Sequence, residues 1–290
     1  MNVNWKKKWL EAIGEPTNYA FEHTLKLQEQ FSTEDFDGEI YSQANAPRRS
    51  QTMLLMLPKE VSFPCPGVVV PFYYPDAEAG YDLQSKEKIE EKQARALKLV
   101  RRGYVVASAE AYHLTYKDSD LPRRDFSRWP MSAEALMLDH PHWTGIGKLI
   151  ADTQLMIDVL EADPRCKASK IGICGHSLGG KMAFYTGCLD TRIKAILASD
   201  FGIGWEQTNW RDEWYWGSKV DELVAAGMDH SQLLNIGDKP FMLLAGQFDN
   251  EDSQKYLNSK AILLNHASGH DPTPESLDAG MRFLDQHLKS

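Results

Sequence analysis

The chain has 290 residues and a formal net charge of −9, with 42% apolar and 25% charged residues. These proportions are those of an ordinary soluble globular protein and exclude a largely disordered chain. The length lies at the upper end of what one hydrophobic core supports, so one domain over residues 1–290 is expected. The acidic balance gives no electrostatic reason to expect nucleic acid or an anionic membrane as a partner.

The N-terminal segment and the cysteines indicate the cellular compartment of the protein. The lysines near the N-terminus precede a polar segment and not an apolar one, so no secretory signal peptide is predicted. No window approaches the roughly 18 apolar residues of a membrane span. The four cysteines are Cys65, Cys166, Cys174 and Cys188. They lack C-x-x-C spacing, which argues against a zinc site and against a dense disulfide framework. We therefore expect a cytoplasmic protein without metal or cofactor, and a homo-oligomer is compatible with these features.

Residues 1–60 form the first part of the predicted fold. Two helices are expected there, over residues 5–13 and 19–30. An antiparallel pair of strands, over residues 36–45 and 51–57, follows them.

From residue 67 onwards, apolar runs alternate with segments of helical period, which indicates an α/β fold with a mostly parallel sheet covered by helices on both faces. The run Val68-Val69-Val70 has no polar face, as expected of a strand buried on both sides. Strands are predicted over residues 67–72, 104–107, 170–174, 193–198, 241–245 and 261–264, and helices over residues 85–102, 147–163, 178–188 and 274–288.

Two long segments, residues 110–146 and 200–237, fall outside this alternation. Long connections in a compact domain are usually functional, and tryptophan-rich ones are not typical of disorder. Both are predicted to be cap insertions over a site, and their tryptophans are Trp129, Trp143, Trp205, Trp210, Trp214 and Trp216. Trp143, Trp205 and Trp210 are the residues predicted to line a substrate pocket.

The segment Gly175-His176-Ser177-Leu178-Gly179 has the G-x-S-x-G pattern of a nucleophile elbow. The pentapeptide occurs by chance in a chain of this length with a probability on the order of one in ten. It gains specificity from the apolar strand before it and the helical segment after it, and it predicts Ser177 as a nucleophile at a strand-to-helix turn.

A serine nucleophile needs a base, and the base needs an orienting carboxylate. His270, in a loop just before the last helix, is the predicted base, with His266 as the competing choice. Asp249 follows the strand over residues 241–245 and is the predicted acid. Asp252 and Asp200 stay open as alternatives.

An oxyanion intermediate needs preorganised donors. The backbone N–H of Leu178, at the start of the helix, supplies one of them. The second is expected from the loop after Val70, at Tyr73 or Tyr74, although aromatic packing at the sheet edge explains these tyrosines equally well.

Residues 171–187, together with residues 199–205 and the aromatic segments Asn209-Trp210 and Trp214-Tyr215-Trp216, resemble the acetyl xylan esterase-like branch of the dienelactone hydrolase-related α/β hydrolases. The resemblance covers roughly residues 50–290. It implies the α/β-hydrolase fold and hydrolysis of small, acetyl-type carboxylic esters through an acyl-serine. Dienelactone hydrolases themselves use cysteine as nucleophile, so dienelactone is not the expected substrate.

Two other functions are compatible with the pattern. A prolyl-oligopeptidase-like peptidase shares the fold and the triad order, but the roughly sixty residues before the sheet are too few for a propeller with blades of roughly 40 residues each. A non-catalytic hydrolase-fold protein that binds a ligand is the second, and the presence of Ser, Asp and His argues against it.

Overall fold

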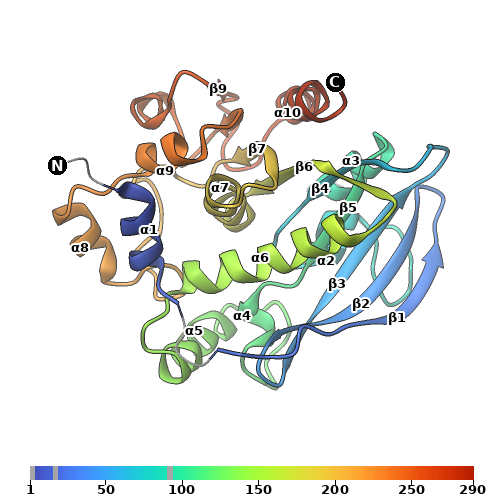
Figure 1. The fold of residues 1–290 in the computed structure, drawn as a ribbon, viewed down its shortest axis with the longest axis horizontal. Coiled ribbons are helices and arrows are strands. Elements are labelled where there is room, and N and C mark those ends of the chain that lie inside the picture. Colours follow the sequence, from blue (N-terminus) through green and yellow to red (C-terminus); the bar gives the residue numbers. More distant parts are fainter. Residues whose placement is uncertain (1–3, 16–18, 90–93) are drawn as a thin grey trace.

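The computed structural model describes residues 4–15, 19–89 and 94–290, and its centre is a twisted sheet (Figure 1). The strands β4 to β9 run parallel, whereas β1, β2 and β3 are antiparallel and join the others through the β3–β5 pair. Within the described residues the sheet has nine strands, in the spatial order β1 (Leu25–Ser32), β2 (Phe36–Ala46), β3 (Arg49–Pro58), β5 (Val105–Ala109), β4 (Cys65–Val69), β6 (Cys166–His176), β7 (Ile193–Ser199), β8 (Phe241–Ala245) and β9 (Ala261–Asn265).

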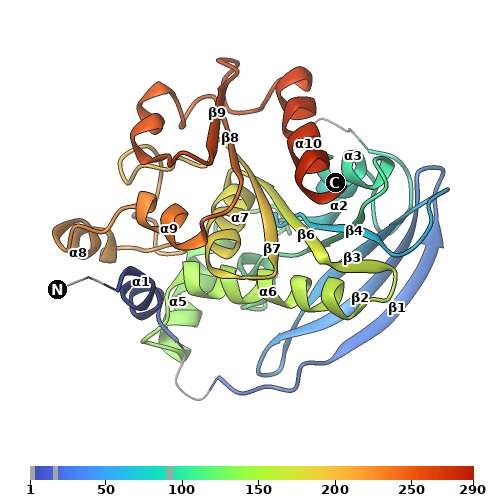
Figure 2. The same ribbon diagram turned by 45° about the horizontal axis from the view of Figure 1, so that its top comes forward.

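Helices cover both faces of this sheet (Figure 2). On one face, α6 (Gly145–Ala162) and α7 (Leu178–Leu189) bury side chains such as Ile157 and Phe184 in the larger hydrophobic cluster. On the other face, α3 (Arg95–Arg101) and α10 (Pro274–Leu288) contribute to a second cluster. The predicted α/β class with a mostly parallel sheet is confirmed, and the two apolar clusters explain why the central strands have no polar face.

The remaining helices are short. They are α1 (Trp5–Ile13), α2 (Pro75–Ala79), α4 (Tyr112–Thr115), α5 (Arg128–Asp139), α8 (Lys219–Ala225), α9 (His230–Gly237) and the 3₁₀ helix η1 (Glu251–Tyr256). The segment 110–146 contains α4 and α5, and the segment 200–237 contains α8 and α9. No helix in the described ranges has the length and apolar character needed to cross a bilayer.

Two predicted helices are wrong in whole or in part. Residues 25–32 form the edge strand β1, which pairs antiparallel with β2, so pairing with a neighbouring strand overrides the helix propensity of its Leu, Lys and Gln residues. In the predicted helix over residues 85–102, only Arg95–Arg101 is helical, and residues 90–93 lie outside the described part. The side chain of Asp82 accepts hydrogen bonds from the backbone of Gln84 and Ser85, which forms a turn where a helix was expected.

Candidate active site

Ser177 occupies a sharp turn between β6 and α7. Its φ of 54° lies in the left-handed region, which a serine adopts only when the surrounding structure enforces it. A Cβ on Gly175 would lie 2.0 Å from the carbonyl oxygen of Gly179, and a Cβ on Gly179 would lie 2.1 Å from that of Pro71. The two glycines therefore allow the close approach of helix and strands that the predicted elbow requires.

Ser177 and His270 line one cavity of about 600 Å³. The described lining contains no Asp, Glu, Lys or Arg. Aromatic side chains dominate it, and they are Phe72, Tyr73, Phe126, Trp129, Tyr215 and Phe248. Thr208 and Asn209 add polar atoms. Both predicted insertions contribute side chains to these walls.

The two candidate bases are placed differently. His270 reaches the cavity from the loop between β9 and α10, and its ring lies 4.5 Å from that of His176, the residue before the nucleophile. His266 does not line the cavity, and its Nδ1 is 2.7 Å from Oγ of Ser268. The structure thus brings His270, and not His266, to the same cavity as Ser177.

The carboxylate next to His270 belongs to Asp200 and not to Asp249. Nδ1 of His270 lies 2.6 Å from Oδ2 of Asp200, whose side chain is fully buried directly after β7. Burial acts to raise the pKa of Asp200, but hydrogen bonds from His270 and from the backbone of Asp249 and Phe248 outweigh it and hold the pKa below its usual value. The predicted contact between Asp249 and His270 is therefore corrected.

Asp249 is bonded to the backbone instead. Its carboxylate accepts hydrogen bonds from the backbone N–H groups of Phe201, Gly202 and Ile203, at 2.7–2.9 Å, and from the hydroxyl of Ser253. None of the hydrogen bonds found for this carboxylate in the described part of the chain involves His270. Asp252, the other alternative, is exposed on η1.

The oxyanion candidates lie at the junction of β4 and α7. Leu178 is the first residue of α7 and is fully buried beside the nucleophile. Tyr73 lines the cavity, where its ring stacks on that of Trp129, and its backbone N–H is the donor considered for the oxyanion. Tyr74 lies outside the cavity lining, beneath the guanidinium groups of Arg123 and Arg124.

The three predicted pocket tryptophans do not line the cavity. Trp205 and Trp210 are buried, and their indole N–H groups donate to the carbonyls of Met228 and Gly202. Trp143 borders a different hollow, beside α1 and α6. Trp129 is the tryptophan that reaches the cavity, because the helix α5 directs it toward Tyr73.

Lys181, which sequence reasoning did not single out, lies one helical turn after the nucleophile. It is 2% exposed, and burial lowers its pKa to about 7. Its amino group donates to the carbonyl of Phe201 and contacts Thr208 and Asn209, at 3.1–3.5 Å. Its position four residues after Ser177 was the available signal, because the backbone N–H of Lys181 donates to the carbonyl of Ser177 in the first turn of α7.

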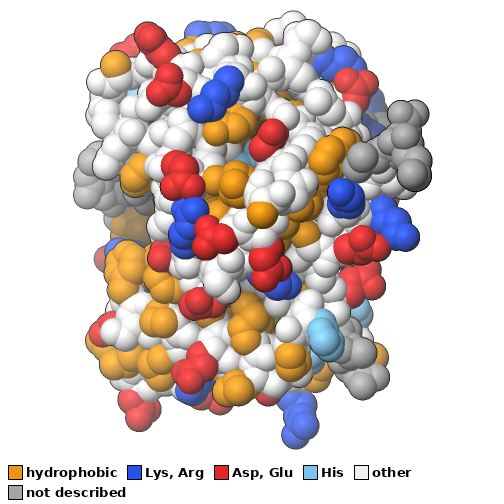
Figure 3. Space-filling model, turned by 90° about the vertical axis from the view of Figure 1, so that its left-hand side faces the viewer, with side chains coloured by type: hydrophobic (Ala, Val, Ile, Leu, Met, Phe, Trp, Pro, Cys, Tyr) orange, Lys and Arg blue, Asp and Glu red, His pale blue; other side chains and the backbone are white. Residues whose placement is uncertain are grey.

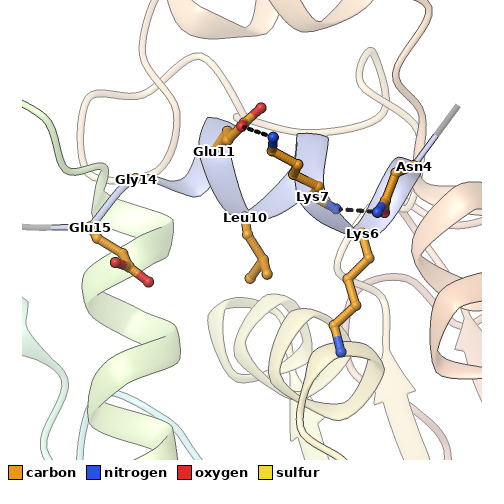
Figure 4. Close-up of a pocket in the computed structure, with 7 residues that line it drawn as sticks. All are labelled: Asn4, Lys6, Lys7, Leu10, Glu11, Gly14 and Glu15. Atoms are coloured by element: carbon orange, nitrogen blue, oxygen red, sulfur yellow. Dashed lines mark hydrogen bonds and ion pairs between the residues drawn. The ribbon is translucent and has the colours of Figure 1, made fainter.

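Another hollow, of about 530 Å³, runs along α1 (Figure 4). The side chains that line it belong to the exposed surface of this helix and include an ion pair between Lys7 and Glu11. Acidic, basic and hydrophobic side chains are interspersed on the face of the molecule that carries α1 (Figure 3). This hollow holds no residue of the serine, histidine and aspartate set.

Comparison with known proteins assigns the chain to a family. The model of the dienelactone hydrolase family matches residues 52–208, which include the elbow and Asp200. A glucuronoyl esterase from Solibacter usitatus has a TM-score of 0.67 and 13% identity, covering 94% of this chain and 88% of that one.

Two further solved structures share the fold. Acetyl xylan esterase 1 from Thermoanaerobacterium sp. JW/SL YS485 has a TM-score of 0.61 and 13% identity, covering 100% of this chain and 99% of that one. An acetyl xylan esterase from Paenibacillus sp. R4 has a TM-score of 0.64 and 16% identity, covering 93% of this chain and 90% of that one. A search of curated proteins finds no match. Because the family model covers more than half of the sequence, the chain belongs to the dienelactone hydrolase family.

Proposed function

We propose that this protein is a serine esterase that hydrolyses small carboxylic esters through an acyl-Ser177 intermediate. One observation carries the proposal: a serine held at a strained elbow shares a cavity with a histidine whose Nδ1 is paired with a buried carboxylate. A nucleophile, a base and an orienting acid are the parts that acyl transfer to serine requires.

The roles follow from the hydrogen bonds. The carboxylate of Asp200 accepts from Nδ1–H of His270, which leaves Nε2 unprotonated and able to take the proton of the Ser177 hydroxyl. The serine oxygen then bonds to the ester carbonyl carbon, and the alcohol leaves with the proton from Nε2. Water, deprotonated by the same nitrogen, adds to the acyl carbon and releases the acid and free Ser177.

The negative oxygen of the tetrahedral intermediate needs two donors. We assign them to the backbone N–H groups of Leu178 and Tyr73, because α7 begins at Leu178 and Tyr73 faces the cavity. Asp249 then acts through structure, by fixing the backbone at Phe201–Ile203.

The substrate and the cellular context complete the proposal. An acetyl-type ester is supported by two of the structural relatives, which are named acetyl xylan esterases. A cytoplasmic location is supported by the cysteines, which are all buried free thiols. We expect a small molecule, and neither nucleic acid nor a membrane, to be the partner, and the two segments 110–146 and 200–237 to cap the site.

A covalent probe and a matched pair of histidine variants test this function. A fluorophosphonate should label the native protein at Ser177, and Ser177→Ala should lower kcat/KM for 4-nitrophenyl acetate by several orders of magnitude without unfolding. His270→Ala should lose activity to a similar extent, whereas His266→Ala should keep most of it.

Other results would contradict the proposal in different ways. The absence of an adduct on folded protein would favour a ligand-binding protein. Hydrolysis of prolyl peptides in preference to esters would favour the peptidase. Activity lost in His266→Ala and kept in His270→Ala would move the base to His266.

A further inference from the structure

One wall of the cavity that holds Ser177 consists of aromatic rings in contact with one another. The rings of Tyr73 and Trp129 lie 4.3 Å apart with an interplanar angle of 12°, and the ring of Phe126 lies 4.1 Å from that of Trp129. We refer to Tyr73, Phe126 and Trp129 as the aromatic wall. All three line the cavity, so a substrate bound at Ser177 lies within reach of them.

The outer part of this wall is open to water. Phe126 is 68% exposed, although Trp129 behind it is only 5% exposed. An apolar ligand surface placed against Phe126 removes both surfaces from water, which is the main favourable contribution in such pockets. The wall therefore favours a ligand with a flat apolar face.

The polar side chains of Thr208 and Asn209 are already engaged in hydrogen bonds. The hydroxyl of Thr208 donates to Oδ1 of Asn209, the amide of Asn209 donates to Asp212, and the ammonium of Lys181 contacts both Thr208 and Asn209. Burial raises the pKa of the Tyr73 and Tyr215 phenols, so both rings present neutral hydroxyl groups.

This arrangement separates two kinds of ring. A sugar stacks on aromatic side chains but also carries several hydroxyl groups, which lose hydrogen bonds to water unless the protein replaces them. Here Thr208 and Asn209 are already bonded to each other and to neighbouring side chains, and the described lining contains no Asp, Glu, Lys or Arg. An aromatic ring makes no such demand and gains from ring-to-ring contact.

We propose that the ester cleaved at Ser177 is neutral and carries an aromatic ring, in its acyl half or in its alcohol half, which packs against the aromatic wall. The inference rests on the proposed esterase function and adds the substrate class. It differs from the sugar esters named for the structural relatives.

Matched esters test the ring and locate it. The pair benzyl acetate and cyclohexylmethyl acetate differs only in the aromaticity of the alcohol half, and the pair methyl phenylacetate and methyl cyclohexylacetate does the same for the acyl half. We expect kcat/KM of the aromatic member to be higher by roughly 2- to 10-fold in one pair, the range that an aromatic contact supplies. A monoacetylated methyl xyloside should be a poorer substrate than the better aromatic ester.

Variants connect the preference to the wall. Phe126→Leu and Trp129→Leu should bring the aromatic-to-cyclohexyl ratio close to one, while Phe21→Leu, at a phenylalanine that does not line the cavity, should leave it unchanged. If Trp129→Leu fails to fold, the exposed Phe126 still provides the test. Equal rates within both pairs, or a xyloside cleaved faster than either aromatic ester, would overturn the inference while leaving the esterase function intact.

Binding separates this inference from the proposed function. Saturation-transfer NMR on Ser177→Ala protein, with the same two pairs, measures ring recognition without hydrolysis. Preferential binding of the aromatic member to a protein whose native form hydrolyses no ester would support the ring site and refute the esterase. No preference in binding would refute the ring site.

Discussion

Asp200 and Asp249 follow adjacent parallel strands, β7 and β8, and each is fully buried. Hydrogen bonds to the backbone connect the two residues. The carboxylate of Asp200 accepts from the N–H of Asp249, and the carboxylate of Asp249 accepts from the N–H of Phe201, next to Asp200. In the sequence both are acids at the carboxyl end of an apolar strand, where α/β folds place their sites. Which carboxylate faces His270 depends on how the loops after β7 and β8 pack against each other, and a one-dimensional pattern does not contain this packing.

The two aspartates should therefore respond differently to the same substitution. Asp200→Asn should lower kcat by roughly 10⁴-fold, as for the corresponding aspartate of serine proteases, because an amide can hold His270 in the wrong tautomer. Asp249→Asn places an NH₂ group against backbone N–H donors, so it should lower the melting temperature, with a smaller effect on kcat.

Measuring kcat together with thermal unfolding for both variants distinguishes the roles. An Asp249→Asn protein with unchanged melting temperature and a 10⁴-fold lower kcat would return the acid role to Asp249.

At the scale of elements, α1 shows how residues outside the family match support the site. Trp9 is fully buried, and its ring lies 6.2 Å from those of Trp205 and Trp216 and 5.8 Å from that of His230. The N-terminal helix is thus packed against the segment 200–237, which supplies Thr208, Asn209 and Tyr215 to the cavity.

Removing this side chain should cost stability. Trp9→Ala should lower the free energy of unfolding by about 3–5 kcal/mol, the range for deleting a buried aromatic side chain. Leu10→Ala, on the exposed side of the same helix (44% exposed), should change it by no more than roughly 0.5 kcal/mol. Urea unfolding of both variants checks this, and equal losses would mean that α1 contributes only its own helix stability.

The elements that the sequence predicted well are those with one dominant signal. The elbow, α7, β8 and α10 follow from apolar runs, apolar period and glycine spacing. The strand β1 carries mostly exposed side chains, so no burial pattern marked it. Trp205 and Trp210 were expected at the cavity on composition alone, but whether a tryptophan faces a cavity or the core depends on how the insertion folds.

At the scale of the whole molecule, burial has made several histidines neutral. His113, His176 and His230 are at most 1% exposed, and burial lowers the pKa of each. None of them is the proposed base. Unfolding at mildly acidic pH frees them to bind protons, so they favour the unfolded chain as the pH falls.

His113 offers a direct measurement of this effect. Burial lowers its pKa to about 3, against an ordinary value of about 6.5, and its ring packs 4.3 Å from Tyr112 and 5.4 Å from Trp129. Between these two pH values the unfolded state holds a proton that the folded state lacks. The stability contribution of His113 is therefore full above about pH 6.5 and falls by about 1.4 kcal/mol per pH unit toward pH 3.

His113→Phe removes this titration and keeps an aromatic ring in an aromatic site. From pH 8 to pH 5, the native protein should lose about 2 kcal/mol more of its unfolding free energy than the variant does. Urea unfolding at both pH values measures it. A difference that stays constant across this range would mean that the folded protein accommodates a charged imidazole at this position, and that the surroundings of His113 are more polar than its burial among Tyr112 and Trp129 indicates.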